Sequence, residues 1–141
     1  MISRRSLLGI AAGALAVAAF GATQLTGGSV SPAAAGQKLA FGIPAFQAAQ
    51  AAGKPILVDI AADWCTTCRR QKPIISQLSD KPKFKDLVIF EVDFDTQKPI
   101  VRAFGARYQS TLIVFRGTKE VGRSVGETRA AGIEALLDRT I

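Results

Sequence analysis

Residues 56–68 read ILVDIAADWCTTC, and this stretch decides the fold. Its first six residues form a short, almost unbroken apolar run, which is typical of a strand buried in the middle of a sheet. A helix is expected to follow over residues 65–78, with Pro73 inside it as a kink. Cys65 and Cys68 therefore lie where a buried strand passes into a helix.

The chemistry of the cysteine pair follows from that placement. A helix N-terminus has unpaired N–H groups and the positive end of the helix dipole, and both favour a thiolate over a thiol. We therefore expect Cys65 to ionise readily. The two-residue spacer lets the second sulfur reach the first within one helical turn, so Cys65 can attack a partner disulfide and Cys68 can resolve the mixed disulfide.

The cysteine pair also has other interpretations. A structural disulfide across so short a loop would stabilise the fold by only about 2 kcal/mol. A zinc site normally needs four cysteine or histidine ligands, and the chain has two cysteines and no histidine. A copper or iron–sulfur centre shared between two chains stays open as the alternative. Redox exchange is favoured, because a C-x-x-C motif at a strand-to-helix junction is typical of thiol–disulfide chemistry.

Asp59 interrupts the buried strand six positions before Cys65. Burial disfavours the charged form of a carboxyl group, so the pKa of Asp59 is expected to be raised. Such a group can take and return the proton of Cys68 during exchange, although a hydrogen-bonded structural aspartate at the strand end is the alternative. Trp64, directly before the first cysteine, is expected to shield the sulfurs and contact partners, with core packing as its alternative.

The rest of residues 36–141 predicts a single domain of strands and helices. Further strands are expected at 38–41, 87–94, 111–115 and 120–125, and further helices at 44–52, at 98–104 and after Thr128, which would cap the last one. Strand–helix–strand units predict a parallel core, and the terminal hairpin adds antiparallel edge strands. The expected fold is therefore α/β, with one sheet covered by helices on both faces.

Residues 1–35 have the pattern of an export signal. Arg4 and Arg5 are the only charged residues of this segment, and the apolar run over residues 7–20 is too short to span a bilayer as a helix. Paired arginines before an apolar pair resemble the twin-arginine export signal. Cleavage is expected after Ala35, with an uncleaved membrane anchor as the alternative, and the domain is predicted to be periplasmic.

The formal net charge is +7 at pH 7, but the basic residues are spread along the chain. The densest cluster, Lys81, Lys83 and Lys85, falls in a stretch that is predicted to be a loop. The sequence has neither a basic face interleaved with aromatics nor a recognisable nucleic-acid-binding module. We therefore predict a solvated basic surface and no nucleic-acid partner.

Residues 56–59 followed by 62–68 resemble the buried-aspartate strand and the W-C-x-x-C active site of the thioredoxin family. Pro73 stands at the position of that family's kinking proline, and parts of residues 104–115 resemble the segment that leads into its fourth strand. The resemblance covers residues 38–141.

This resemblance implies a thioredoxin-like α/β fold, with a central mixed β-sheet flanked by helices, and a protein thiol–disulfide oxidoreductase without cofactor or metal. It implies Cys65 as nucleophile, Cys68 as resolving thiol and Asp59 as proton acceptor. The partners that it implies are protein disulfides as substrates and, for an exported domain, a thiol–disulfide electron donor in the membrane.

Two features depart from the family pattern. The spacer Thr66-Thr67 is not the Gly-Pro of cytoplasmic thioredoxins, and the redox direction stays open. The spacer also lacks the histidine of strongly oxidising relatives, and this absence favours a reductant over an oxidant. Ser110 stands where the family has a cis-proline, and a cis bond before a non-proline residue costs about 3–4 kcal/mol, so this bond is expected to be strained or trans. In the family that loop pairs with the substrate backbone and helps keep metals off the thiols. The predicted substrate-binding residues are therefore Trp64, Gln109 and Ser110, and the change at Ser110 strengthens the metal-centre alternative.

Overall fold

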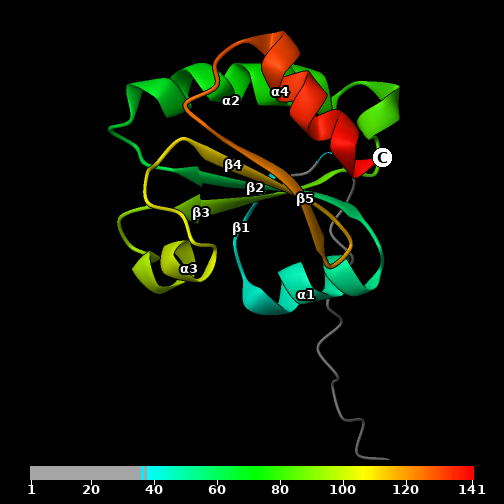
Figure 1. Ribbon diagram of the computed structural model, residues 1–141, viewed down its shortest axis with the longest axis horizontal. Coiled ribbons are helices and arrows are strands. Elements are labelled where there is room, and N and C mark those ends of the chain that lie inside the picture. The colour runs from blue at the N-terminus through cyan, green and yellow to red at the C-terminus, as the bar shows by residue number, and fades with distance from the viewer. Residues whose placement is uncertain (1–35, 37) are drawn as a thin grey trace, which may run out of the picture.

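The computed structural model describes residue 36 and residues 38–141 (Figure 1). Its elements are, in chain order, β1 (Lys38–Ala40), α1 (Ile43–Ala51), β2 (Pro55–Ala61), α2 (Thr66–Ser79), the 3-10 turn η1 (Pro82–Phe84), β3 (Val88–Asp93), α3 (Lys98–Ala103), β4 (Thr111–Arg116), β5 (Lys119–Val125), α4 (Ala130–Leu137) and the 3-10 turn η2 (Asp138–Thr140). The predicted strands and helices are all present.

Within the described residues, no helix is long and apolar enough to cross a membrane. The export signal and its cleavage after Ala35 lie outside the described residues.

One five-stranded sheet forms the centre of the fold, in the order β1-β3-β2-β4-β5. β1, β3 and β2 are parallel, whereas β4 runs antiparallel to β2, and β5 antiparallel to β4. The mixed α/β sheet is therefore confirmed. The expectation that both hairpin strands lie at an edge is wrong for β4, because it lies between β2 and β5. Its buried run from Thr111 to Phe115 agrees with this interior position.

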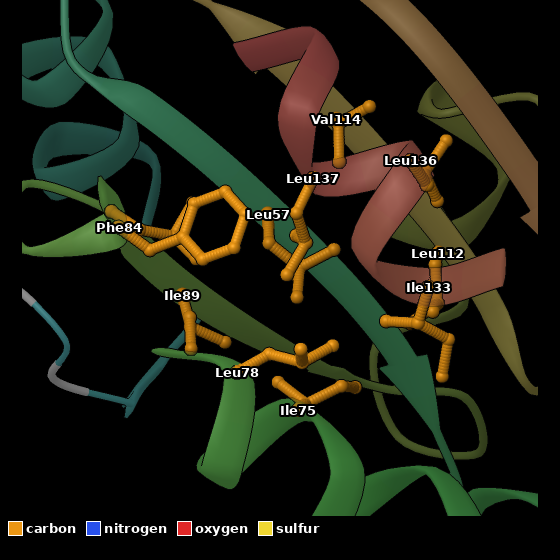
Figure 2. Close-up of a cluster of buried hydrophobic side chains, with 11 residues drawn as sticks. Leu57, Ile75, Leu78, Phe84, Ile89, Leu112, Val114, Ile133, Leu136 and Leu137 are labelled. Carbon is orange, nitrogen blue, oxygen red and sulfur yellow. The ribbon is translucent and has the colours of Figure 1, made fainter. Parts of the chain in front are cut away.

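Helices cover both faces of the sheet, with α2 and α4 on one face and α1 and α3 on the other (Figure 1). The core beneath α2 and α4 (Figure 2) includes Leu57, Ile75, Leu78, Phe84, Leu112, Ile133 and Leu137. Leu57 of β2 belongs to this core, and Val58 belongs to the core on the opposite face. Because side chains alternate along a strand, Asp59 lies on the same face as Leu57, beneath α2.

The start of α4 corrects one prediction. Thr128 does not cap the helix, because the N-cap residue is Arg129 and no side chain forms a cap hydrogen bond there. Instead, Oε1 of Glu127 accepts a hydrogen bond from the backbone N–H of Arg129 at 2.8 Å. Hydrogen bonds from the side chain and backbone of Arg129 lower the pKa of Glu127 to about 2. The Glu127 carboxylate therefore binds the backbone of the N-cap residue itself and does not cap the helix.

The lysine cluster around η1 is partly paired. Nζ of Lys81 lies 2.8 Å from the Glu134 carboxylate of α4, and Nζ of Lys83 lies 2.6 Å from the Asp138 carboxylate. The segment was predicted to be a loop, and it includes the short η1 turn. The three lysines are exposed, as the predicted solvated surface requires, and two of them form surface ion pairs with carboxylates of α4 and η2.

Candidate active site

Cys65 is the N-cap residue of α2, and Cys68 lies in the first turn of the helix. The two sulfurs form a disulfide, with the Cα atoms 5.3 Å apart, which is a usual separation for a disulfide. The backbone N–H of Cys68 donates to Sγ of Cys65 at 3.1 Å. After reduction of the disulfide, this N–H group and the helix dipole stabilise a negative charge on the sulfur of Cys65.

Both cysteines are buried just beyond the end of β2, with exposed fractions of 3% for Cys65 and 1% for Cys68. They pack with Ala61 and Ala62, and Phe94 covers the cluster from the residue after β3. Since so little of either sulfur reaches the surface, a partner disulfide must dock closely on the surrounding residues before exchange can occur.

Asp59 is buried, as predicted, and is only 1% exposed. Its Oδ2 atom accepts a hydrogen bond from Nζ of Lys38 at 3.4 Å, whereas Oδ1 has no partner among the described residues. Burial raises the pKa of Asp59 above its ordinary value, and the positive charge of Lys38 offsets this only in part. The carboxyl group contacts Lys38 and is hydrogen-bonded to neither cysteine in this oxidised state. Its part in proton transfer therefore stays a prediction.

Three charged side chains surround Asp59 near one edge of the sheet. The parallel register pairs Asp59 with Glu91 of β3, and Lys38 of β1 lies beyond β3. Nζ of Lys38 also pairs with the Glu91 carboxylate, which lies 3.9 Å from Nζ of Lys72 on α2. These three residues line an open groove of about 460 Å³. Sequence reasoning missed them because Lys38 reaches Asp59 only through the strand register.

Lys38→Met is expected to raise the pKa of Asp59 further, because Lys38 is the strongest electrostatic influence that lowers it. Lys72→Met should raise the pKa by a smaller amount, since its lowering effect is the weakest. Lys54→Met is the control, because Lys54 pairs with a different carboxylate, that of Asp86, 3.7 Å away. Titration of the Asp59 carboxyl carbon by NMR measures the pKa. The same pKa in wild type and Lys38→Met would contradict the conclusion that the charge of Lys38 lowers the pKa of Asp59.

Trp64 is 58% exposed, so the core-packing alternative for this residue is wrong. Its indole Nε1 donates a hydrogen bond to Oδ2 of Asp95 at 2.7 Å. Asp95 follows β3, and no pattern in the sequence pointed to this contact. The hydrogen bond fixes one edge of the indole beside Cys65 and leaves much of the ring open to a docking partner.

Gln109 and Ser110 lie in the loop that enters β4, and the register pair of Ile60 with Thr111 puts this loop beside the end of β2. Ser110 is buried and has a φ of 56°, the only left-handed φ of a non-glycine residue in the described part of the chain. Its hydroxyl donates to the carbonyl of Gln109 at 2.6 Å. A left-handed conformation costs an L-residue about 1–2 kcal/mol, and proline, with φ near −65°, cannot adopt it. The loop therefore differs in backbone conformation from one built on proline.

The metal-centre alternative gains no support. Within the described residues, no group of three or more His, Cys, Asp or Glu side chains is placed to hold a metal ion. No finding favours a copper or iron–sulfur centre over thiol–disulfide exchange.

Comparisons of the sequence with known proteins point to a single family. The sequence model of the family described as Thioredoxin matches residues 43–139. A thioredoxin of Mycobacterium tuberculosis (strain H37Rv) is 36% identical over 84 residues, which are 60% of this chain and 69% of the relative. Thioredoxin H-type of Fagopyrum esculentum is 33% identical over 81 residues, which are 57% of this chain and 68% of the relative.

Solved structures agree with the sequence relatives. The crystal structure of Trxlp from Edwardsiella tarda EIB202 is similar with a TM-score of 0.70 and 42% sequence identity, over 72% of this chain and 98% of that chain. Thioredoxin NaTrxh from Nicotiana alata is similar with a TM-score of 0.62 and 28% identity, over 73% of this chain and 91% of that chain. The similarity therefore covers most of the residues that form the sheet, its helices and the cysteine site.

Proposed function

This chain belongs to the thioredoxin family and is a thiol–disulfide oxidoreductase, and from that premise we propose that it reduces disulfide bonds of other proteins in the periplasm. The observation that carries the proposal is the disulfide of Cys65 and Cys68 at the N-terminus of α2, with the N–H of Cys68 directed at the sulfur of Cys65. Such a pair carries two electrons as two thiols and gives them up when its disulfide forms.

Cys65 is the nucleophile in this proposal. Its thiolate attacks one sulfur of a partner disulfide, so that a mixed disulfide forms, the partner's own S–S bond breaks and one partner thiolate leaves. The thiolate of Cys68 then attacks Sγ of Cys65, which breaks the mixed disulfide and releases the second partner thiolate. The partner has gained two electrons, and Cys65 and Cys68 are left as a disulfide.

Asp59 is the proton acceptor for Cys68. The thiol of Cys68 must lose its proton before it can attack, and Asp59 lies on the face of β2 that α2 covers. Burial raises the pKa of the Asp59 carboxyl. A raised pKa lets the group take a proton and give it back at a pH closer to neutral. The proton passes from Asp59 to solvent or to a departing partner thiolate at the end of the cycle.

Trp64, Gln109 and Ser110 contact the substrate in this proposal. The indole of Trp64 is exposed beside the nucleophile, and the loop of Gln109 and Ser110 lies beside the end of β2. The oxidised pair must be reduced again for each turnover. For a domain exported by residues 1–35, a thiol–disulfide protein of the membrane is the fitting donor, because cytoplasmic reductants do not reach the periplasm.

The midpoint potential of the cysteine pair tests the direction of the reaction. We expect a value near that of thioredoxin, about −270 mV, when the metal-free protein is equilibrated with graded thiol buffers. A value near about −120 mV would contradict the proposal and make the protein a disulfide donor. Reduction of the interchain disulfides of insulin by the pre-reduced protein tests the substrate class, and cell fractionation tests the location.

A further inference from the structure

Gln71 is an unusual residue for its position. It lies three residues after Cys68 on the buried face of α2. Further along the same face the buried residues include the apolar Ile75 and Leu78. Its exposed fraction is 0%. A polar side chain in such a place destabilises the fold unless its hydrogen-bonding groups find partners. The contacts of its carboxamide therefore indicate what the residue does.

The Nε2 group of Gln71 donates to two backbone carbonyls, that of Glu127 at 2.9 Å and that of Ser110 at 3.4 Å. The carbonyl of Ser110 also accepts the backbone N–H of Gly126 at 3.0 Å. One side chain of the helix that carries the cysteines thus joins the loop before β4 and the loop after β5. Both loops lie at the end of the sheet where the disulfide is located.

The Gln71 carboxamide is one of the contacts that hold the loop before β4. Ser110 is held at a φ of 56°, which a non-glycine residue adopts only where surrounding interactions impose it. The hydrogen bond from the Ser110 hydroxyl to Gln109 is local and does not connect the loop to the helix. The Gln71 carboxamide is the side-chain contact that connects the Ser110 carbonyl to α2.

We propose that Gln71 is a positioning residue for the protein substrate, which holds the loop of Gln109 and Ser110 at a fixed place relative to Cys65. The proposal rests on the proposed function and deepens it. A substrate segment that docks on this loop then presents its disulfide at the nucleophile. Loss of the contact weakens docking but leaves the chemistry of the two sulfurs intact.

The oxygen of the Gln71 carboxamide allows a positioning role to be tested separately from structural support. Oε1 of Gln71 is buried and has no partner among the described residues, which is unfavourable for stability. Leucine fills a similar space without a buried polar atom. Gln71→Leu removes that buried oxygen but also leaves the Glu127 carbonyl without its side-chain donor, so we expect it to unfold cooperatively in urea with a stability near that of the wild type, although its docking of a protein substrate is weaker.

The test uses the pre-reduced chain and an excess of insulin, and measures the half-saturating concentration and the limiting rate of disulfide exchange. Gln71→Leu and Gln71→Met should raise the half-saturating concentration about fivefold, the effect of losing one hydrogen bond, with an unchanged limiting rate. Their rates with a small aromatic disulfide and their midpoint potentials should equal those of the wild type. Ile75→Met is the matched control, because it alters packing on the same helix face without touching either loop.

Unchanged half-saturation in both Gln71 variants would overturn the proposal. The proposal would also fall if the midpoint potential or the rate with the small disulfide changed together with the half-saturating concentration. The same conclusion would follow if Ile75→Met had the same effect, or if both Gln71 variants lost cooperative unfolding. Each of these results would indicate a general structural role for Gln71. A wild-type protein that failed to reduce insulin would overturn the proposed function itself. An active wild type with unaffected Gln71 variants would overturn only the inference about Gln71.

Discussion

Cys65→Ser is expected to lower the rate of protein-disulfide reduction by at least about a thousandfold, because a serine hydroxyl does not ionise at neutral pH and is a far weaker nucleophile. The fold should remain intact. Serine is a favoured N-cap residue, and its oxygen can accept the N–H of Cys68 that the sulfur of Cys65 accepts now. Release of free thiols from insulin measures the activity, and urea unfolding checks the stability.

Cys68→Ser is the matched variant, because it removes the second sulfur and leaves the nucleophile in place. Cys65 can then attack, but nothing resolves the mixed disulfide, so a covalent adduct with the substrate protein should accumulate. Non-reducing electrophoresis detects the adduct, and a thiol reductant should dissolve it. An adduct that formed with Cys65→Ser and not with Cys68→Ser would reverse the two roles.

Much of the fold could be predicted from residues 56–68 because the signals there are local. A short apolar run indicates a buried strand, and the C-x-x-C motif marks the start of the helix. The hairpin of β4 and β5 was equally clear, because two strand-like runs flank a turn at Gly117. The order of strands in the sheet is not a local property, which is why β4 was assigned to an edge although β2 and β5 flank it.

The cysteines and Asp59 could be predicted for the same reason, since all three lie within the same short stretch. The surroundings of Asp59 could not, because Lys38 and Glu91 approach it through the register of three strands. Gln71 did leave a signal, a polar residue at helical spacing from Cys68 on an apolar face. Its partners, two backbone carbonyls in distant loops, have no signature in side-chain chemistry.

Asp59→Asn is expected to slow the resolution step by about a hundredfold near neutral pH, the usual contribution of a positioned general base. Asparagine keeps the size of the side chain but cannot accept the proton of Cys68. The wild-type rate should rise with pH as Asp59 ionises, and this rise should be absent in the variant. Rapid mixing of the pre-reduced protein with insulin measures the step. Asp63→Asn, which changes an exposed carboxylate near the same cysteines, is the control and should leave the rate unchanged.

The stability of Asp59→Asn provides an independent test of the same carboxyl group. Burial raises the pKa of Asp59 in the folded protein, so above its ordinary pKa the unfolded state releases a proton that the folded state still holds. The free energy of unfolding of the wild type should therefore fall as the pH rises from about 4 through the raised pKa, because ionisation favours the unfolded chain. Asparagine does not titrate, so the variant should gain stability relative to the wild type over that range, as measured by urea unfolding at each pH. A constant difference between the two proteins at every pH would show that Asp59 has an ordinary pKa, and would remove it as the proton acceptor of Cys68.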